Sequence, residues 1–443
     1  MKTINVIGAG LAGTEAAYQA ARRGVRVRLY EMKPHKKTPA HHSDLFGELV
    51  CSNSLRNASV DSAAGLLKEE LRRMGSLMME AADASRVSAG GALAVDRVLF
   101  AEYITDKIRS NSFIEVVEEE VGQIPEDEIT VIATGPLTSD ILAKEIAKLT
   151  GKNGLSFFDA AAPIVDFSTV DMSRAFFASR YGKGDADYIN CPMHEDEYKA
   201  FYNALISAEE AELHDFDKDE PLVVFEGCMP VEVMAKRGED TLRYGPLKPV
   251  GIRHPETGEK YYAVVQLRRE DEIGSMYNLV GFQTHLTFPE QRRVFRMIPG
   301  LEDAEFLRYG VMHRNTFLSS PDLLDADYSL RKNKNIFFAG QMTGVEGYIE
   351  SAASGYVAGL AAVCRASGTD APVFPRETMI GAMAHYVSHG GTGDFQPMNA
   401  NFGIIPPLET PVKGGRRMRY PLYAKRALEA LAAVDLMLPS EIF

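Results

Sequence analysis

A glycine-rich turn near the start of the chain constrains the fold most strongly. The apolar stretch INVIG predicts a short buried strand, GAGLAG follows it, and TEAAYQAARRG is typical of a helix that ends at Gly24. The alternating stretch VRVRLYE predicts a second strand. Gly8, Gly10 and Gly13 therefore stand in a strand–helix–strand unit, where a tight turn, a close backbone approach and close helix packing each require glycine.

The same unit predicts a nucleotide site. The amino end of the helix favours an anion such as a pyrophosphate, and Glu31 ends the second strand, where an acid can bind a ribose hydroxyl. The residues expected to contact the nucleotide are Gly8, Ala9, Gly10, Leu11, Ala12, Gly13 and Glu31.

Two later glycine sites indicate further parts of this domain. EITVIATGP predicts a buried strand that ends near Gly135. NIFFAGQMTGVEGYIESAASGYVAGLAA predicts a strand, a turn containing Gly340 and Gln341, and a helix of small residues. The amino end of this helix could face a ligand, but its composition equally fits close packing against the sheet.

The region between these glycine sites has no second GxGxxG motif. Its short strands, such as PLVVFEG and YYAVVQL, predict an inserted domain of α+β type. We therefore expect a first part of the nucleotide-binding domain at 1–155, an insertion at 156–325, and a second part with a basic C-terminal segment at 326–443.

Composition limits the class of protein. The chain has 443 residues, a formal net charge of −13 and four scattered cysteines, which predicts a protein of the reducing cytoplasm without a disulfide scaffold. We recognise no secretory signal and no apolar run long enough to span a membrane. The histidines lack metal-ligand spacing, so we expect no metal site. Net acidity argues against a nucleic-acid partner unless basic residues gather locally.

The cysteines are the candidate reactive groups. Cys51 lies in ELVCSNSLR, and it is either a small buried residue or a thiolate supported by serine, asparagine and the nearby Arg56. Cys228 follows Gly227 at the end of an expected strand, near basic residues. Cys191 has fewer basic neighbours, and Cys364 occupies an apolar position in the expected small-residue helix, which predicts a core residue.

Basic clusters are the candidate RNA contacts, although most such runs are solvated surfaces. Tyr420 and Tyr423 interleave with the C-terminal cluster as stacking residues would. The basic residues are Arg268, Arg269, Arg292 and Arg293 in the insertion, and Lys413, Arg416, Arg417, Arg419, Lys425 and Arg426 near the C-terminus.

Together these motifs resemble one known family from end to end. GAGLAGTEAA, TPAHHSD, ELVCSNSLR, AGGALAVDR, YINCPM, FEGCMPVEVMAKRG, VGFQTHL and FFAGQMTGVEGYIESAASG are similar to segments of the bacterial folate- and FAD-dependent tRNA (uracil-5-)-methyltransferases. The larger flavoproteins that modify wobble uridine share the glycine motif. They have a long helical C-terminal extension that this chain lacks, and they lack CSNSLR.

The resemblance implies a Rossmann-type FAD-binding domain of the glutathione-reductase kind with an inserted α+β domain. It implies that NADH or NADPH reduces FAD, that methylenetetrahydrofolate donates one carbon, and that uridine 54 of the tRNA T-loop becomes 5-methyluridine. It places Cys51 and Cys228 at the active site, where a thiolate adds to carbon-6 of uracil and activates carbon-5. We prefer Cys51 as the essential thiol because its loop follows the FAD-binding unit.

Three alternatives stay open from the sequence. The same chemistry could act on 23S ribosomal RNA. The chain could instead be a thiol and flavin NAD(P)H oxidoreductase in which Cys51 and Cys228 form a reversible disulfide, or an RNA-binding flavoprotein without activity. The oligomeric state, the folate-binding residues and the general base are not predicted.

Overall fold

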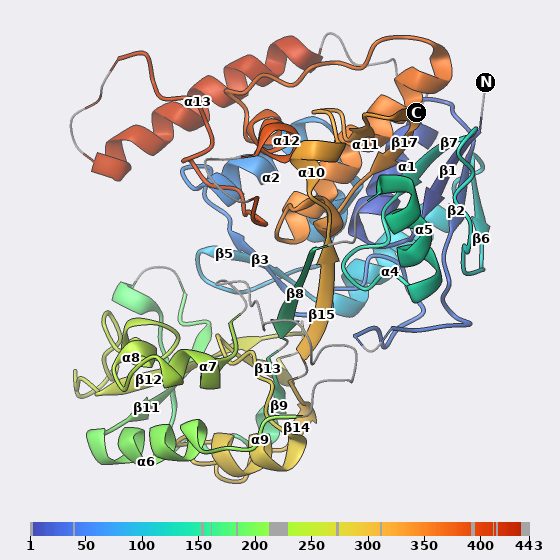
Figure 1. Cartoon of the computed structure of the whole chain (residues 1–443). Helices are drawn as coiled ribbons and strands as arrows, with labels where there is room; N and C mark the ends of the chain where they lie inside the picture. Colours follow the sequence, from blue (N-terminus) through green and yellow to red (C-terminus); the bar gives the residue numbers. More distant parts are fainter. Residues whose placement is uncertain are drawn as a thin grey trace.

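The computed structural model describes most of the chain in two lobes joined by a ribbon (Figure 1). The described residues are 3–38, 40–151, 155–160, 162–182, 185–211, 229–271, 274–310, 312–390, 395–410, 412 and 415–435.

The first lobe is built on a six-stranded sheet that confirms the strand–helix–strand unit. β1, β2, β6, β7 and β17 run parallel, and β16 is antiparallel at one edge. Every residue of β1 is buried, as expected of a central parallel strand covered on both faces. In spatial order the strands are β16 (Ser329–Leu330), β17 (Asn333–Phe338), β7 (Ile129–Ile132), β1 (Ile4–Ile7), β2 (Val27–Tyr30) and β6 (Ile114–Val117).

Helices α1 (Leu11–Arg22) and α11 (Tyr348–Ser367) pack closely against each other beside this sheet. A Cβ at Gly355 would lie 2.2 Å from the carbonyl oxygen of Ala12, and one at Gly359 would lie 2.7 Å from that of Ala16. The small residues of α11 therefore serve close packing, which was one of the two interpretations of their composition. Their main partner is helix α1, however, and not the sheet that this interpretation expected.

Other elements complete the first lobe. A three-stranded antiparallel sheet follows the segment that contains Cys51, with β5 in its centre. Its strands are β3 (Ser54–Asn57), β4 (Arg86–Val87) and β5 (Ala92–Val95). The remaining helices here are α2 (Ala63–Arg73), α3 (Leu77–Ala84), α4 (Arg97–Arg109), α5 (Asp140–Thr150), α10 (Ser320–Leu323) and α12 (Met379–His389).

The second lobe contains a six-stranded antiparallel sheet and its own apolar core, which confirms the expected α+β insertion. The expected strand YYAVVQL corresponds to β12, whereas PLVVFEG lies outside the described residues. In spatial order the strands are β10 (Phe176–Phe177), β11 (Tyr188–Met193), β12 (Ala263–Arg269), β13 (Met276–Leu279), β9 (Ile164–Asp166) and β14 (Phe306–Arg308). Its helices are α6 (Glu195–Ile206), α7 (Val231–Lys236), α8 (Thr241–Tyr244) and α9 (Phe288–Phe295).

An antiparallel pair of strands carries the chain between the lobes (Figure 1). The chain leaves the first lobe along β8 (Leu155–Ala160) and returns along β15 (Met312–Phe317). The expected domain limits fall at the start of β8 and just after α10, and they stay predictions.

The C-terminal segment contains a helix rather than only an extended basic tail. Helix α13 (Gly415–Asp435) includes Pro421, and it buries one narrow face formed by Ala424, Ala427 and Leu431. Within the described ranges, no helix combines the length and the apolar character needed to cross a membrane.

Candidate functional site

A pocket opens at the carboxyl ends of β1, β2 and β7, where a doubly wound sheet binds its ligands. It encloses about 1130 Å³ of free space, with the solvent at its mouth included. Eight of the ten residues predicted to bind the cofactor line it: Gly8, Gly10, Leu11, Ala12, Glu31, Gly135, Gly340 and Gln341. The other two, Ala9 and Gly13, do not line this pocket.

The glycines of the turn have separate physical roles. Gly8 has φ +98°, and a Cβ on Gly13 would lie 1.8 Å from the carbonyl oxygen of Gly8, so both glycines are required for the turn itself. A Cβ on Gly10 or Gly135 would meet no protein atom within 4 Å. Both positions border the pocket, so they leave room for a ligand to approach the backbone.

Glu31 is fixed in position by two backbone donors. The N–H of Ala9 donates to its Oε2 at 2.8 Å, and the N–H of Lys33 donates to its Oε1 at 3.0 Å. A carboxylate oxygen can accept more than one hydrogen bond, so Glu31 can still accept from a ribose hydroxyl in the pocket. Ala9 therefore contributes by orienting the acid.

The far wall of the pocket leads to Cys51. Gly340 and Gln341 follow β17, and Tyr348 and Ser351 lie at the amino end of α11. Val50 also lines the pocket, and it directly precedes Cys51. The predicted thiol thus adjoins the predicted nucleotide site.

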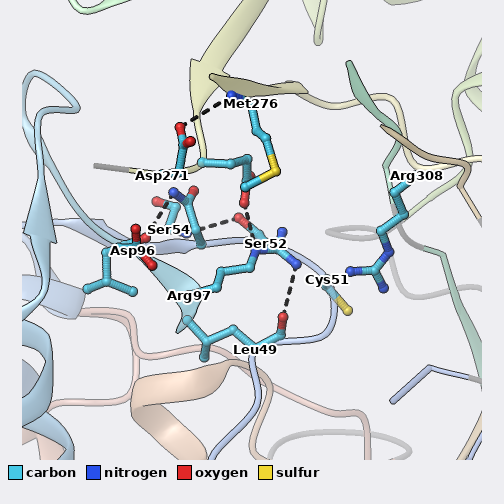
Figure 2. Close-up of polar contacts among 12 residues, drawn as sticks. Leu49, Cys51, Ser52, Ser54, Asp96, Arg97, Asp271, Met276 and Arg308 are labelled. Carbon is cyan, nitrogen blue, oxygen red and sulfur yellow. Dashed lines mark hydrogen bonds and ion pairs between the residues drawn. The ribbon is translucent and has the colours of Figure 1, made fainter. Parts of the chain in front are cut away.

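Residues 49–53, here called the Cys51 segment, are held by side chains from three distant elements. Arg97, at the start of α4, donates to the carbonyl oxygen of Leu49 at 3.0 Å (Figure 2). Arg308, in β14, donates to that of Val50 at 2.7 Å. The hydroxyl oxygen of Tyr348 accepts from the N–H groups of Cys51 and Ser52 at 2.7 and 3.1 Å.

The end of the segment is tied to the second lobe. Arg268 donates to Asn53 Oδ1 at 3.0 Å and to Ser52 Oγ at 2.6 Å, and Asn53 donates to the carbonyl oxygen of Arg269 at 2.8 Å. Arg268 is only 8% exposed. It was predicted as an RNA contact, but in this structure its guanidinium binds within the protein, because Ser52 and Asn53 supply its acceptors.

Arginine charge surrounds the Cys51 segment. Burial opposes the charge of Arg97, but Glu270, with a contact of 2.6 Å, Tyr348 and Cys51 together raise its pKa. Burial and the charge of Arg97 lower the pKa of Arg308, against an opposing contribution from Cys51. Burial raises the pKa of Tyr348 well above its ordinary value, so it remains a neutral phenol.

The sequence predicts Cys51 as a candidate reactive thiol, but it does not predict which residues surround it. Arg56, the expected neighbour, forms an ion pair of 3.4 Å with Glu350 and also contacts Asn399. The Cys51 segment is bound instead by Arg97, Arg308 and Tyr348. The motifs AGGALAVDR and GVEGYIES contain two of them, but nothing in one sequence indicates that these motifs meet ELVCSNSLR.

The other cysteines differ from Cys51. Cys191 and Cys364 are buried, whereas Cys51 is partly exposed. Burial raises the pKa of Cys191 to about 12 and also raises that of Cys364, so both favour the neutral thiol. Cys364 is a buried residue of α11, in agreement with the prediction of a core position. Cys228 lies outside the described residues, and its role stays a prediction.

The arginines predicted to contact RNA lie on three separate elements. Arg268 and Arg269 belong to β12 and Arg292 and Arg293 belong to α9, both in the second lobe, and the others lie on α13 at the opposite end of the molecule (Figure 1). Lys413 lies outside the described residues. Tyr420 and Tyr423, the expected stacking residues, pack against Phe402 with ring centroids 4.3 and 5.6 Å apart. Exposed basic side chains on α13 include Arg416, Arg417 and Arg419.

Over the described parts of the chain, no three His, Cys, Asp or Glu side chains gather as a metal site would require. The expected absence of a metal stays a prediction, since Cys228 and its neighbours fall outside those parts.

The family comparison and the curated relatives match most of the length of this chain. The family described as glucose inhibited division protein A matches residues 3–370. The methylenetetrahydrofolate--tRNA-(uracil-5-)-methyltransferase TrmFO of Acetivibrio thermocellus is 59% identical over 97% of each chain. That of Ligilactobacillus salivarius is 57% identical, again over 97% of each chain.

Among solved structures, two crystal forms of Aquifex aeolicus GidA each match with a TM-score of 0.70. They are 17% and 18% identical, and they cover 98% of this chain and 73% and 76% of the GidA chains. At this identity the likeness concerns the fold, and it confirms the Rossmann-type α/β architecture.

Proposed function

Because the chain belongs to the family of methylenetetrahydrofolate--tRNA-(uracil-5-)-methyltransferases, we propose that it methylates carbon-5 of a tRNA uridine with a one-carbon unit from methylenetetrahydrofolate. The proposed target is uridine 54 of the T-loop, the proposed product is 5-methyluridine, and the proposed location is the cytoplasm. The observation that supports the chemistry is the pocket wall that runs from Glu31 past Gly10 and Gly340 to Val50, next to Cys51.

FAD fits the residues of this pocket. Gly10 and Gly135 leave open space along the backbone, the amino end of α1 favours a pyrophosphate, and Glu31 is oriented to bind a ribose. When bound, FAD supplies the redox chemistry that turns the methylene unit of the folate into a methyl group, with NADH or NADPH as the source of electrons. The chain has no second GxGxxG motif, so we propose that the pyridine nucleotide binds only transiently.

Cys51 is the proposed nucleophile. Carbon-5 of uracil is a poor nucleophile until a thiolate adds to carbon-6 and creates an enolate. The Cys51 segment is suited to this task because Tyr348, Arg97 and Arg308 fix its backbone beside the pocket. Cys228 is proposed as the second thiol of the site.

We propose that exposed basic residues of α13, among them Arg416 and Arg417, contribute to RNA binding by neutralising phosphates. Arg416→Glu with Arg417→Glu should weaken tRNA binding and reduce the slope of log affinity against log salt by about two. Lys425→Glu with Glu429→Lys reverses a nearby exposed pair and keeps the net charge, so it serves as the control. Equal affinity of the double arginine variant across the salt series would show that this face does not touch RNA.

The experiment that tests the proposal is nucleoside mass spectrometry on RNA incubated with the purified flavoprotein, NADH and methylenetetrahydrofolate with a labelled methylene carbon. One reaction contains unmodified tRNA, and another contains a 23S ribosomal RNA fragment. Labelled 5-methyluridine in the tRNA supports the proposal, and a uridine 54→cytidine tRNA without label identifies the position.

Two other outcomes would contradict it. Label only in the ribosomal fragment would keep the chemistry and reject the tRNA target. Consumption of NADH without label in either RNA would reject methyl transfer and favour a thiol and flavin oxidoreductase.

A further inference from the structure

The two arginines that bind the Cys51 segment differ in their partners. Arg97 forms an ion pair with Glu270 at 2.6 Å. Arg308 forms no ion pair with any carboxylate among the described residues, although its side chain is partly buried. Burying an unpaired cation is costly, so this guanidinium favours a nearby anion.

Cys51 is the group placed to supply that anion. Arg97 binds the carbonyl group of Leu49 and Arg308 binds that of Val50, which are the two residues before Cys51. Figure 2 shows the guanidinium of Arg308 directed toward the sulfur of Cys51. Arginine beside a cysteine stabilises the thiolate relative to the thiol.

We propose that Arg97 and Arg308 are positioning residues that hold Cys51 as a thiolate at the edge of the pocket. Arg308 does so from the second lobe, so the reactivity of a thiol in the first lobe depends on a residue of the insertion. The value of a thiolate to catalysis rests on the proposed function, but its existence does not.

The other charged groups around the segment leave this balance positive. Glu48, just before the segment, lies 3.7 Å from Lys33. Glu270, directly after β12, faces Arg97 and also Arg268, which is 3.8 Å away. On α11, Tyr348 is a neutral phenol. Both carboxylates form ion pairs with cations other than Arg308, although the charge of Glu48 also acts on Arg308.

The test measures the alkylation of Cys51 by iodoacetamide as a function of pH in the flavin-loaded protein. Peptide-resolved mass spectrometry distinguishes Cys51 from the other cysteines. Because only the thiolate reacts, the rate rises with pH around a midpoint that reports the fraction ionised. For the wild type we expect this midpoint below about 8.5, the ordinary value for a thiol.

Two substitutions separate charge from shape. Arg308→Gln can still donate to the carbonyl group of Val50 but loses the charge, whereas Arg308→Lys keeps the charge. We expect Arg308→Gln to raise the midpoint by about one pH unit, which slows alkylation about tenfold below it, and Arg308→Lys to restore most of the loss. Arg97→Lys should likewise resemble the wild type. The control is Arg174→Gln, since Arg174 lies in the same lobe as Arg308 but contacts Glu197 and Glu302.

Several outcomes would overturn the proposal. They are a wild-type midpoint at or above 8.5, an unchanged midpoint in Arg308→Gln, and a lysine variant as impaired as the glutamine variant. If Arg308→Gln fails to fold, the midpoint of the wild type still tests whether Cys51 is held as a thiolate. The assay contains neither folate nor RNA, so a low midpoint without methyl transfer would reject the proposed function and leave this inference standing.

Discussion

The pocket and the Cys51 segment lie side by side but are built in different ways. The pocket is shaped mainly by backbone, because the turn at Gly8–Gly13 and the open positions at Gly10 and Gly135 leave space along the main chain. The Cys51 segment is shaped by side chains that bind its backbone, chiefly Arg97, Arg308 and Tyr348.

This difference predicts that different substitutions impair the two regions. A pocket shaped by backbone should lose its ligand when an added methyl group fills it, and changes in the charges of distant residues should affect it little. The Cys51 segment depends instead on hydrogen bonds with Arg97, Arg308 and Tyr348, which lie 48, 258 and 297 positions along the chain from the residues that they contact. Substitutions can therefore separate cofactor binding from thiol function.

Cys51→Ala should have the largest effect. We expect methyl transfer to fall below detection, because no other thiol of the described chain adjoins the pocket. The flavin content should stay at the wild-type level, since Cys51 contributes no wall to the backbone pocket. Labelled 5-methyluridine and the flavin absorbance measure the two properties. Near-normal activity would exclude Cys51 as the nucleophile.

Two glycine substitutions test the backbone pocket from opposite directions. Gly13→Ala places a Cβ 1.8 Å from the carbonyl oxygen of Gly8, so it should lower the free energy of unfolding by about 3 kcal/mol. Gly10→Ala meets no protein atom, so the stability of the flavin-free protein should change by less than about 0.5 kcal/mol. Urea unfolding of the flavin-free proteins measures both.

Gly10→Ala should instead weaken FAD binding about tenfold or more, since its methyl group enters the space left for the ligand. Fluorescence titration with FAD gives the dissociation constant. Unchanged FAD affinity in Gly10→Ala would mean that the cofactor does not approach this turn, and the pocket would need another ligand.

Glu70 predicts how pH acts on the lobe that contains the pocket. Burial raises its pKa from 4.5 to about 7, although the N–H groups of Met379 and Ile380 donate to it. Between pH 4.5 and 7 the folded protein keeps a proton that the unfolded chain has lost. Raising the pH through this window should therefore reduce the contribution of Glu70 to the free energy of unfolding by about 3 kcal/mol.

Glu70→Gln should flatten this dependence, whereas Glu69→Gln changes a partly exposed neighbour and should not. Urea unfolding at several pH values measures the difference between the variants. Parallel curves for the wild type and Glu70→Gln would show that Glu70 ionises normally. The effect of pH on Cys51 alkylation should be independent of both substitutions, which separates the two regions.

Tyr348→Phe should give the smallest effect. It removes one oxygen that accepts from the N–H groups of Cys51 and Ser52, at a cost of about 1–2 kcal/mol. Hydrogen exchange in the peptide that contains residues 49–53 should become faster. Tyr386→Phe removes an exposed hydrogen bond to Gln396 and serves as the control. Equal exchange in both variants would contradict the role assigned to Tyr348.

The sequence predicts the pocket well and the Cys51 segment poorly, for a physical reason. Gly8, Gly10 and Gly13 belong to one short turn, so their spacing in the sequence is enough to predict the geometry of that turn. Arg97 and Arg308 act on carbonyl groups, which every residue has, so no residue type in ELVCSNSLR indicates them. Arg56 is nearer in the chain, but its side chain binds Glu350 and Asn399 instead.

Packing explains the other differences. Tyr420 and Tyr423 look like stacking residues in the sequence, but Phe402 covers their rings in the fold. The small residues of α11 were recognised as a sign of close packing, but the partner, α1, belongs to the first 22 residues of the chain. Such pairings depend on the tertiary fold rather than on local pattern.

The large sequence separation between the Cys51 segment and the residues that bind it has a consequence for synthesis of the chain. A ribosome makes the chain from its amino end, so Cys51 emerges long before Arg308 and Tyr348 have been translated. Until then the nascent chain lacks Arg308 and Tyr348. The carbonyl group of Val50 and the N–H group of Cys51 therefore cannot yet form the hydrogen bonds that they form in the folded protein. The thiolate that we propose at Cys51 can therefore be stabilised only after most of the chain has been translated.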